Sequence, residues 1–185
     1  DGAPPGAQRF RPRTEGLFAL IDYFHGGAND YWRVQSKDGL TSFYGAAESV
    51  GADPPVIANP DDRAKVFAWK LSRTEDPFGN RIEYDYLRDA GKDGPRQWDQ
   101  LYLRRIRYVD YTDAAGQAGY LVSVTFLYDD DPPPPGATSA GTRPDSFSEH
   151  RSGFEIRTRR RCKWIVVKTH PNGAPEQLVR AYEFV

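Results

Sequence analysis

The alternation of apolar and polar residues in short runs is the feature that most constrains the fold of this chain. Between Tyr120 and Tyr128, the side chains of Val122, Val124 and Phe126 share one face of an extended segment with Tyr128. Successive side chains of a strand point to opposite sides of the sheet, so this period of two predicts a β-strand. Almost no segment shows the longer period of an amphipathic helix.

The same pattern predicts strands along most of the chain. A phase shift near Arg104 and Arg105 predicts a β-bulge in one of them. Short turns between successive strands favour antiparallel pairing of neighbours. The sequence therefore predicts an all-β class, with long antiparallel strands and hairpins arranged as a meander. The predicted strands are residues 17–23, 31–36, 41–45, 66–74, 81–86, 101–111, 120–128, 154–168 and 178–185.

Segments rich in glycine, proline or polar residues separate the strands. We expect residues 1–16 to form an irregular lead-in and residues 17–185 to form one β domain. Residues 46–62 and 88–99 are predicted loops. Residues 129–143 hold four consecutive prolines and are expected to form an exposed loop, because proline cannot donate a ladder hydrogen bond in a central strand.

The ends of the sequence lead to a further expectation. The chain contains no methionine, and its last residues still alternate as in a strand. We therefore expect a piece of a longer polypeptide. We also expect the final strand to present an unpaired edge or to pair with the same strand of a second copy.

Charge and cysteine content argue against several classes of function. The chain has 25 Lys and Arg against 26 Asp and Glu, a formal net charge of −1. This balance argues against whole-domain attraction to nucleic acid or to an anionic membrane. The single cysteine, Cys162, excludes an internal disulfide framework and a cysteine-rich zinc site. No apolar run reaches the length of about 20 residues that a membrane-spanning helix needs.

Two turns are marked clearly. Asp38 and Gly39 join two alternating runs, which is a strong short-range signal for a β-hairpin because the turn needs positive φ. Asp76, Gly79 and Asn80 mark the second turn. Gly79 and Asn80 tolerate left-handed backbone, and the Asp76 carboxylate can accept hydrogen bonds from nearby amides.

The second turn opens a longer motif that resembles a known repeat. Residues 76–86 resemble the D-x-x-G-N-x-x-x-Y-x-Y unit of Rhs/YD-repeat proteins, with Tyr84 and Tyr86 as the aromatic pair. The alternative reading is a generic hairpin whose aromatic residues pack against neighbouring strands.

Three further segments extend the resemblance. Residues 31–45, 102–108 and 145–162, in this order and spacing around residues 76–86, resemble the N-terminal domain shared by the SpvB virulence protein and the B component of insecticidal toxin complexes. The resemblance covers about residues 30–185 and departs from the family pattern at His150, where a tyrosine is expected, and in a proline-rich insertion before Asp145. The motif residues of the last segment are Arg151, Gly153, Phe154, Glu155 and Arg157.

The resemblance implies a structural role without catalysis. In toxin complexes of this family, the B component and a C-type, Rhs-like component build a shell around a toxic effector, and the shell docks on an A-type pore component. In the SpvB protein a related region precedes a separate ADP-ribosyltransferase domain, whose Ser-Thr-Ser strand and Glu-x-Glu loop do not occur in this sequence. The resemblance thus implies a secreted scaffold module with no cofactor, no metal and no catalytic residue.

Several residues could carry chemistry, and each also has a simpler role. The basic run from Arg157 to Lys163 is expected to be a solvated or salt-bridged strand face, whose arginines could pair across strands with acids such as Glu83 or Asp85, and not a nucleic-acid site. Residues 129–131 are three aspartates and are expected to form a solvated acidic turn, since a calcium loop needs spaced ligands and a glycine. The three histidines lack partners at metal-ligand spacing. Cys162 is expected to be a buried small hydrophobe.

A glycan- or receptor-binding β-sandwich is the alternative function that the sequence leaves open. It would use exposed tryptophans to stack on sugars. Trp69 and Trp164 lie in apolar strands and are expected to pack in the interior, whereas Trp98 lies in a predicted polar loop and is the better candidate for a contact surface.

Overall fold

The computed structural model of the chain describes residues 2–14, 16, 18–27, 29–49, 51–113, 116, 118–134, 143–171 and 174–185. Within these residues the chain forms strands and turns and no helix, which confirms the predicted all-β class. The strands are β1 (Ala7–Phe10), β2 (Leu20–Phe24), β3 (Tyr31–Gln35), β4 (Thr41–Tyr44), β5 (Val56–Asn59), β6 (Asp62–Trp69), β7 (Leu71–Glu75), β8 (Arg81–Asp93), β9 (Arg96–Thr112), β10 (Ala118–Tyr128), β11 (Phe147–Glu149), β12 (Ile156–Thr158), β13 (Cys162–Thr169) and β14 (Gln177–Glu183).

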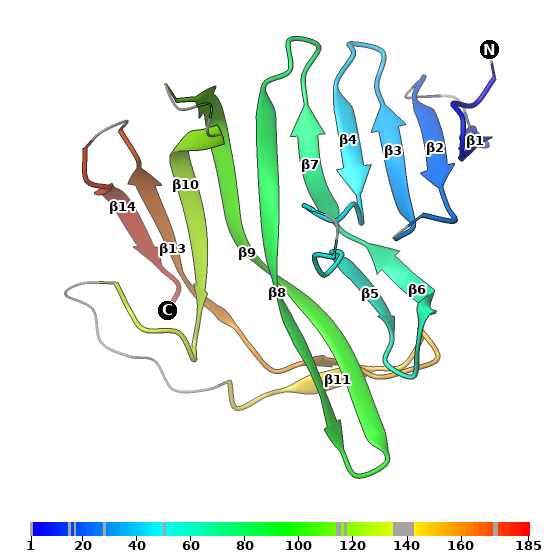
Figure 1. Cartoon of the computed structure of the whole chain (residues 1–185). Coiled ribbons are helices and arrows are strands. Elements are labelled where there is room, and N and C mark those ends of the chain that lie inside the picture. The colour runs from blue at the N-terminus through cyan, green and yellow to red at the C-terminus, as the bar shows by residue number, and fades with distance from the viewer. Residues whose placement is uncertain are drawn as a thin grey trace.

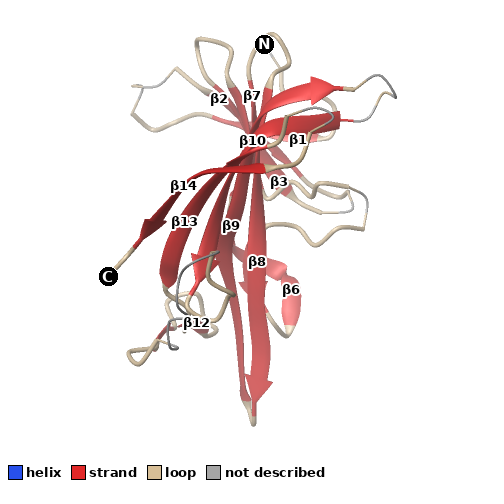
Figure 2. Ribbon diagram, turned by 90° about the vertical axis from the view of Figure 1, so that its left-hand side faces the viewer, coloured by secondary structure: helices blue, strands red, loops and turns tan. Residues whose placement is uncertain are grey.

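Ten of these strands form one antiparallel sheet in the order β1-β2-β3-β4-β7-β8-β9-β10-β13-β14 (Figure 1). Neighbours in the sheet are neighbours along the chain, except where the hairpins β5–β6 and β11–β12 are inserted. The predicted meander is therefore confirmed, with two interruptions. The sheet twists strongly from the β1 edge to the β14 edge (Figure 2), as open antiparallel sheets do.

The longest strands extend the sheet beyond its other members. β8 and β9 pair from Glu83 opposite Arg107 down to Asp93 opposite Arg96, and their hairpin projects past the end of β10 (Figure 1). Residues 88–99 were predicted to be a loop, and this expectation is wrong. Their polar side chains form buried ion pairs, a stabilisation that a hydrophobicity pattern does not reveal.

The other corrections concern short segments. β1 lies within the expected irregular lead-in and pairs with β2 from Ala7 opposite Phe24. β5 lies within the expected loop 46–62, because Val56 and Ile57 are buried against the sheet. The expected single strand 154–168 is two strands, β12 and β13, since residues 159–161 turn away to contact other elements. Residues 135–142 of the expected proline-rich loop lie outside the described residues.

The β-bulge that the sequence predicts is confirmed between β8 and β9. Asp85 is opposite Arg105 and Tyr86 is opposite Leu103, so Arg104 is the extra residue on the bulged strand. The bulge brings Arg105 and Arg107 into register with the acidic residues of β8, which matters for the ion pairs described below.

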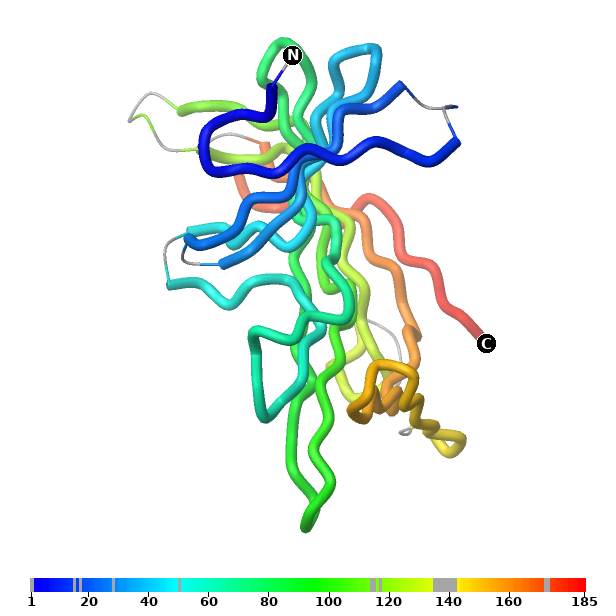
Figure 3. The backbone as a smooth tube through the Cα atoms, turned by 90° about the vertical axis from the view of Figure 1, so that its right-hand side faces the viewer, coloured from blue at the N-terminus to red at the C-terminus, as the bar shows by residue number. Residues whose placement is uncertain are grey.

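The inserted hairpins hold the β8–β9 hairpin from two sides. In Figure 3, β5–β6 lies on one side of β8–β9 and the segment that contains β11–β12 lies on the other. Below the end of β10, the free edge of β9 is occupied by a parallel bridge between Trp98 and Glu155. The hydrophobic core lies here: Ile57, Leu101 and Ile156 are buried together, with Ala68, Tyr86 and Phe154 packed around them.

Candidate interaction surface

The turn at Asp76 is held by its own side chain. Oδ1 of Asp76 accepts hydrogen bonds from the backbone N–H of Phe78 (2.8 Å) and of Asn80 (3.0 Å), and Oδ2 accepts one from the Asn80 side chain (2.7 Å). The bond from the Asn80 side chain is the main reason that the pKa of Asp76 lies below its usual value. Gly79 has a φ of 89°, a conformation that favours glycine. The Phe78 side chain is 91% exposed at the tip of this rigid turn.

The two predicted turns lie against each other at one end of the sheet. Gly39 has a φ of 87°, and a Cβ atom built on it would lie 2.7 Å from Cγ of Pro77. Asp38 accepts a short hydrogen bond from the Ser36 hydroxyl, which lowers the pKa of Asp38. Gly39 is therefore needed both for the backbone conformation and for the close approach of the neighbouring turn.

The aromatic pair of the motif joins adjacent strands. Tyr84 lies opposite Ile106 of β9. Tyr86 packs beside the core and donates a hydrogen bond from its hydroxyl to the carbonyl oxygen of Leu71 (2.9 Å). Burial, helped by the nearby Tyr84, raises the pKa of Tyr86 to about 12. The phenol is thus a structural donor that stays protonated at neutral pH.

Glu155 and Arg157 form a charged lid over Trp98. Arg157 pairs with Glu155 (2.7 Å), and its guanidinium lies 4.0 Å from the centre of the Trp98 ring. The hydrogen bond from Arg157 is the largest of several effects that lower the pKa of Glu155 to about 2. A Cβ atom on Gly91 would overlap the Trp98 ring. Trp98, predicted to be exposed, is 7% exposed because the β8–β9 hairpin and this lid enclose it.

The remaining residues of the last motif shape the loop before β12. Gly153 has a φ of 81° and donates its N–H to the carbonyl oxygen of His150 (3.0 Å). Phe154 packs against the core and meets Phe67 of β6 edge to face. Arg151 pairs with Glu149 (2.7 Å) on the surface. The loop therefore delivers Phe154 to the core and Glu155 to the charged lid.

Asp99 is the most deeply buried charged group of this region, with 0% exposure. Its carboxylate accepts hydrogen bonds from Arg88 of β8 (2.5 Å), from Arg63 of β6 (2.7 Å) and from the backbone N–H of Ala58 in β5 (2.8 Å). One side chain of β9 thus connects the main sheet to both strands of the β5–β6 hairpin. Sequence patterns missed it because a buried acid resembles a loop residue until its partners are known.

Asp89 connects the same hairpin to the chain after β12. Its carboxylate pairs with Arg159 (2.6 Å) and accepts a hydrogen bond from the Trp98 indole (3.2 Å). Burial would raise the pKa of Asp89, but the bonds from Arg159 and Trp98 outweigh burial, so the pKa is lowered. The basic run is therefore ion-paired as expected, but Arg159 and Arg160 pair with Asp89 from a segment between two strands.

Glu83 and Asp85, the partners expected for the basic run, pair elsewhere. Arg107 lies 3.0 Å from Glu83 and 2.9 Å from Asp85, and Arg105 lies 2.8 Å from Asp85. The expectation is therefore wrong in its choice of partners, because the bulge at Arg104 sets these arginines beside the acids of β8.

The three consecutive aspartates form the expected turn, but the turn is ion-paired and partly buried instead of solvated. Asp130 pairs with Arg160 (2.5 Å), and Asp131 forms a short ion pair with Arg104. Asp129 is 3% exposed and accepts a hydrogen bond from the N–H of Arg161 (3.3 Å). The segment closes the end of β10 against the chain that leads to β13.

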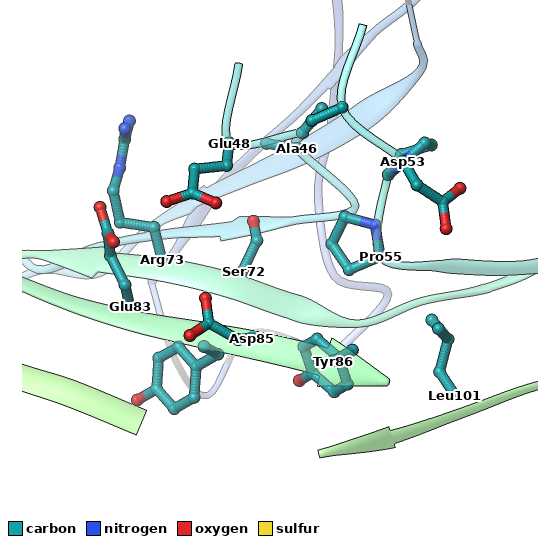
Figure 4. Close-up of a pocket in the computed structure, with 14 residues that line it drawn as sticks. Ala46, Glu48, Asp53, Pro55, Ser72, Arg73, Glu83, Asp85, Tyr86 and Leu101 are labelled. Atoms are coloured by element: carbon teal, nitrogen blue, oxygen red, sulfur yellow. The ribbon is translucent and has the colours of Figure 1, made fainter. Parts of the chain in front are cut away.

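A pocket of about 200 Å³ lies between β7–β8 and the loop after β4. Figure 4 shows Glu48, Glu83 and Asp85 at this pocket with Arg73 and Ser72 beside them. Arg107 forms ion pairs with Glu83 and Asp85, and it also contacts Glu48 (3.2 Å). The charged groups here join the loop to the sheet.

Ser123, His170 and Glu176 have the order of a nucleophile, a base and an acid. Ser123 Oγ lies 2.7 Å from Nε2 of His170, and Nδ1 of His170 lies 3.7 Å from Glu176. Ser123 is only 5% exposed, and it is not among the residues that line the pocket between β7–β8 and the loop after β4. The arrangement therefore joins β10 to the end of β13 and to the chain before β14, with the Ser123 hydroxyl buried.

The side chains of the β14 edge are exposed, in contrast to those of these buried clusters. All seven residues of β14 are exposed. Large apolar side chains gather there and just beyond it: Leu178, Val179, Tyr182, Phe184 and Val185. An open strand edge with exposed apolar side chains is a surface suited to pairing with another strand.

Other classes of site can be assessed within the described parts of the chain. No group of three or more histidines, cysteines, aspartates or glutamates there could hold a metal ion, and no helix there is long and apolar enough to cross a membrane. Cys162 is half-buried, and burial raises the pKa of its thiol. Trp32, Trp69 and Trp164 are half-buried.

The structure brings together the motif residues that the sequence placed far apart. Tyr86, Phe154, Glu155 and Arg157 lie around the β8–β9 hairpin, whereas Asp38, Gly39, Asp76, Gly79 and Asn80 lie at one end of the sheet. Their structural importance remains a prediction. Sequence reasoning missed Asp99 and Asp89, and the signal that would have found them is the density of arginines without nearby acids.

Sequence comparison identifies relatives of this chain. Residues 6–170 match the SpvB family, described as the Salmonella virulence plasmid 65kDa B protein. The chain is 26% identical over 188 residues to the mono(ADP-ribosyl)transferase SpvB of Salmonella typhimurium (strain 14028s / SGSC 2262), with 88% of this chain and 31% of that protein covered. The values are the same for SpvB of Salmonella choleraesuis (strain SC-B67). The chain thus spans less than a third of the length of these relatives.

Solved structures share the fold. The N-terminal domain of effector protein SpvB from Salmonella typhimurium strain LT2 has a TM-score of 0.77 at 22% identity, over 97% of this chain and 69% of that chain. The TcdB2-TccC3-Cdc42 structure has a TM-score of 0.74 at 23% identity, over 95% and 10%. The Photorhabdus luminescens Tc holotoxin pore has a TM-score of 0.72 at 23% identity, over 98% and 10%. Because the family match runs from residue 6 to residue 170, the chain belongs to the SpvB family, as the motifs in its sequence predicted.

Proposed function

We propose that this chain is a non-catalytic wall module of a secreted toxin complex, which helps to encapsulate or present a toxic effector. The observation that carries the proposal is the ten-stranded antiparallel sheet, whose long β8–β9 hairpin is clamped from both sides while the β14 edge stays open. Such a sheet forms a stiff surface that neighbouring strands can continue. The similarity in fold to the Tc toxin structures supports this role.

The engagement of the charged side chains supports the non-catalytic part of the proposal. Asp99, Asp89 and Glu155 are buried, and each is paired with arginines that join one segment of the chain to another. A catalytic acid or base needs access to a substrate. The relatives are named mono(ADP-ribosyl)transferases, and we assign that activity to the part of them that this chain does not match.

The proposed partners are the other components of such a complex. They are a C-type, Rhs-like shell component, an A-type pore component and the enclosed effector, with no role for nucleic acid or for a membrane span. The glycan-binding alternative is not favoured. It requires tryptophans that line an exposed groove, and Trp98, its best candidate, is enclosed.

A chimera tests the structural role. The whole of this chain, β14 included, would replace the region of TcdB2 that it matches, and the chimera would be co-expressed with TccC3. We expect the two proteins to co-purify and to show the unmodified particle in negative-stain electron microscopy. A matched chimera with Asp99→Ala is expected to lose assembly. A chimera with native-like circular dichroism that fails to assemble would contradict the proposal.

A second assay tests the absence of catalysis. The purified chain would be incubated with radiolabelled NAD and a host-cell lysate, with a full-length SpvB transferase as the positive control. We expect labelled protein only in the control. Labelling by this chain that survives repurification would overturn the assignment.

A further inference from the structure

β9 extends past the strand that pairs with its outer edge, the edge that faces away from β8. β10 pairs with β9 as far as Thr125 opposite Arg105, whereas β9 begins at Arg96 (Figure 1). Residues 96–103 are therefore paired with β8 on one side and lie beyond the β10 ladder on the other. An uncovered strand edge is a template for pairing with another chain, and native proteins cover or modify such edges.

The outward backbone groups of this edge follow from one hydrogen bond. The N–H of Asp99 donates to the carbonyl oxygen of Glu155 (3.2 Å), which lies outside the β8–β9 ladder. Alternate residues of an antiparallel strand direct their N–H and C=O groups to opposite sides. The backbone groups of Leu101 and Leu103 therefore also point outward, and those of the residues between them point towards β8.

The outward residues already have bonded backbone groups, as Asp99 does. The N–H of Leu101 donates to the side-chain oxygen of its neighbour Gln100 (2.9 Å). The carbonyl oxygen of Leu103 accepts a hydrogen bond from the Tyr128 hydroxyl (2.8 Å). A backbone group that is bonded in this way is not free to join a ladder with an added strand. Separate contacts therefore close the edge of β9 where the β10 ladder ends.

Residues 155–160, which we call the edge strap, are held along this edge by two side chains of β9. Nε2 of Gln100 donates to Oγ1 of Thr158 (3.0 Å). The hydroxyl of Tyr102 accepts hydrogen bonds from two N–H groups and donates one to a carbonyl oxygen, all within residues 157–160 (3.0, 3.3 and 3.4 Å). Tyr102 is 7% exposed. One buried phenol thus satisfies three backbone groups of the edge strap.

The edge strap has two further anchors. Ile156 is buried in the core with Leu101, and Arg159 forms an ion pair with the buried Asp89 (2.6 Å). These contacts and those of Tyr102 must break when the strap opens, and none of them belongs to the backbone ladder between β8 and β9. The strap can therefore open while β8 and β9 stay paired.

We propose that the edge strap takes the place of β10 beyond Arg105 and prevents the outer edge of β9 from pairing with another copy of the chain. The strap opens as a unit while the sheet stays folded. Opening frees the N–H of Asp99 and uncovers the apolar side chain of Leu101, and the edge then accepts a strand. The proposal does not depend on the toxin-complex role, because it rests on contacts within residues 96–160.

Hydrogen exchange in increasing urea tests whether the strap opens separately from the sheet. The N–H of Asp99 is expected to exchange at a rate that hardly changes at low urea concentration. The N–H of Gln100, which points towards β8, should exchange only when the sheet unfolds. Tyr102→Phe keeps the ring and removes the hydroxyl. It should speed exchange of the Asp99 N–H by about tenfold or more, since the strap loses several hydrogen bonds.

Tyr86→Phe is the matched control. It removes the hydroxyl that donates to the carbonyl oxygen of Leu71 (2.9 Å), so it weakens the sheet and leaves the edge strap intact. The Asp99 N–H should then exchange at the wild-type rate. Thr158→Val removes only the hydrogen bond from Gln100 and should speed exchange of the Asp99 N–H by about fivefold. This milder variant keeps the test available if the phenol proves essential for folding.

Sedimentation velocity tests whether the opened edge pairs. The double variant Tyr102→Phe/Thr158→Val should shift towards faster-sedimenting species more than the wild type does as the concentration is raised to about 500 µM, since a freed strand edge forms a small and weak interface. Tyr86→Phe should sediment like the wild type, which controls for association through any other part of the chain. Circular dichroism of each variant would show that the sheet is intact.

Two results would overturn the proposal. One is an Asp99 N–H that responds to urea as the Gln100 N–H does, or that Tyr102→Phe accelerates no more than Tyr86→Phe does, because the strap would then open only with the sheet. The other is a double variant whose Asp99 N–H exchanges faster while its sedimentation stays that of the wild type, because the opened edge would then not pair.

Discussion

The β8–β9 hairpin and the β14 strand are parts of one sheet, yet they are stabilised in contrasting ways. Around β8–β9, acidic side chains are buried and paired: Asp99 has 0% exposure and Asp89 has 3%. Along β14, every side chain is exposed. The two inserted hairpins cover the first region and leave the second uncovered. The stability of the sheet is therefore concentrated where the insertions lie.

This difference separates two roles within one fold. Buried ion pairs contribute little net stability against apolar alternatives, but they are costly to break and they fix which segments come together. An uncovered edge contributes little to folding and remains available for pairing. We infer that the clamped centre sets the shape of the module and the open edge sets its contacts.

Removal of the Asp99 carboxylate should have the largest effect. Asp99→Ala leaves Arg88 and the Ala58 N–H without their buried partner, which should lower the free energy of unfolding by about 4 kcal/mol. Urea denaturation followed by tryptophan fluorescence measures this change. A loss below roughly 1 kcal/mol, the level of an exposed ion pair, would show that the clamp is unimportant.

Truncation in the core should cost slightly less. Leu101→Ala removes a side chain packed between Ile57 and Ile156 and should lower the free energy of unfolding by about 3 kcal/mol. The same denaturation experiment applies, and a change within about 0.5 kcal/mol would place the core elsewhere.

The lid over Trp98 should depend on pH. The pKa of Glu155 is lowered to about 2, mainly by the hydrogen bond from Arg157. The ionised Glu155 carboxylate therefore stabilises the folded state fully at any pH above its unfolded-state pKa. This stabilisation is lost as the pH falls towards 2. Glu155→Gln should lower the free energy of unfolding by about 1.5 kcal/mol at pH 7, and the two proteins should converge near pH 2. A difference that does not depend on pH would rule out the carboxylate as the cause.

The smallest effect is expected at the open edge. Leu178→Ala removes the same number of atoms as Leu101→Ala, but from a side chain that is 51% exposed. The free energy of unfolding should change by less than about 0.5 kcal/mol. A loss comparable with that of Leu101→Ala would remove the contrast between the two regions.

Sequence patterns predicted the parts of the fold that depend on alternation and on turn chemistry. The meander, the strand ending at Tyr128 and the bulge at Arg104 follow from the side-chain period and its interruption. The Asp76 turn follows from residues whose local hydrogen bonds need no distant partner.

Features that depend on distant partners were not predictable in this way. Residues 88–99 are polar and were expected to be a loop, but their acids meet arginines of other segments: Asp89 pairs with Arg159 and Asp99 with Arg63. Trp98 is enclosed because its ring lies close to Gly91 of β8 and to the guanidinium of Arg157. Periodicity in a single sequence carries no information about these long-range contacts.

Native-state hydrogen exchange at low protein concentration is the most direct test of a clamped centre and an open edge. We expect the amides that hydrogen-bond β8 to β9 around Arg88 and Leu101 to exchange only through global unfolding. The backbone N–H groups of Ala181 and Glu183, which point away from β13 because the neighbouring Phe184 N–H bonds to Lys163, should exchange almost without protection. Strong protection of these two amides at low concentration, or rapid exchange of the β8–β9 ladder around Leu101, would contradict this expectation.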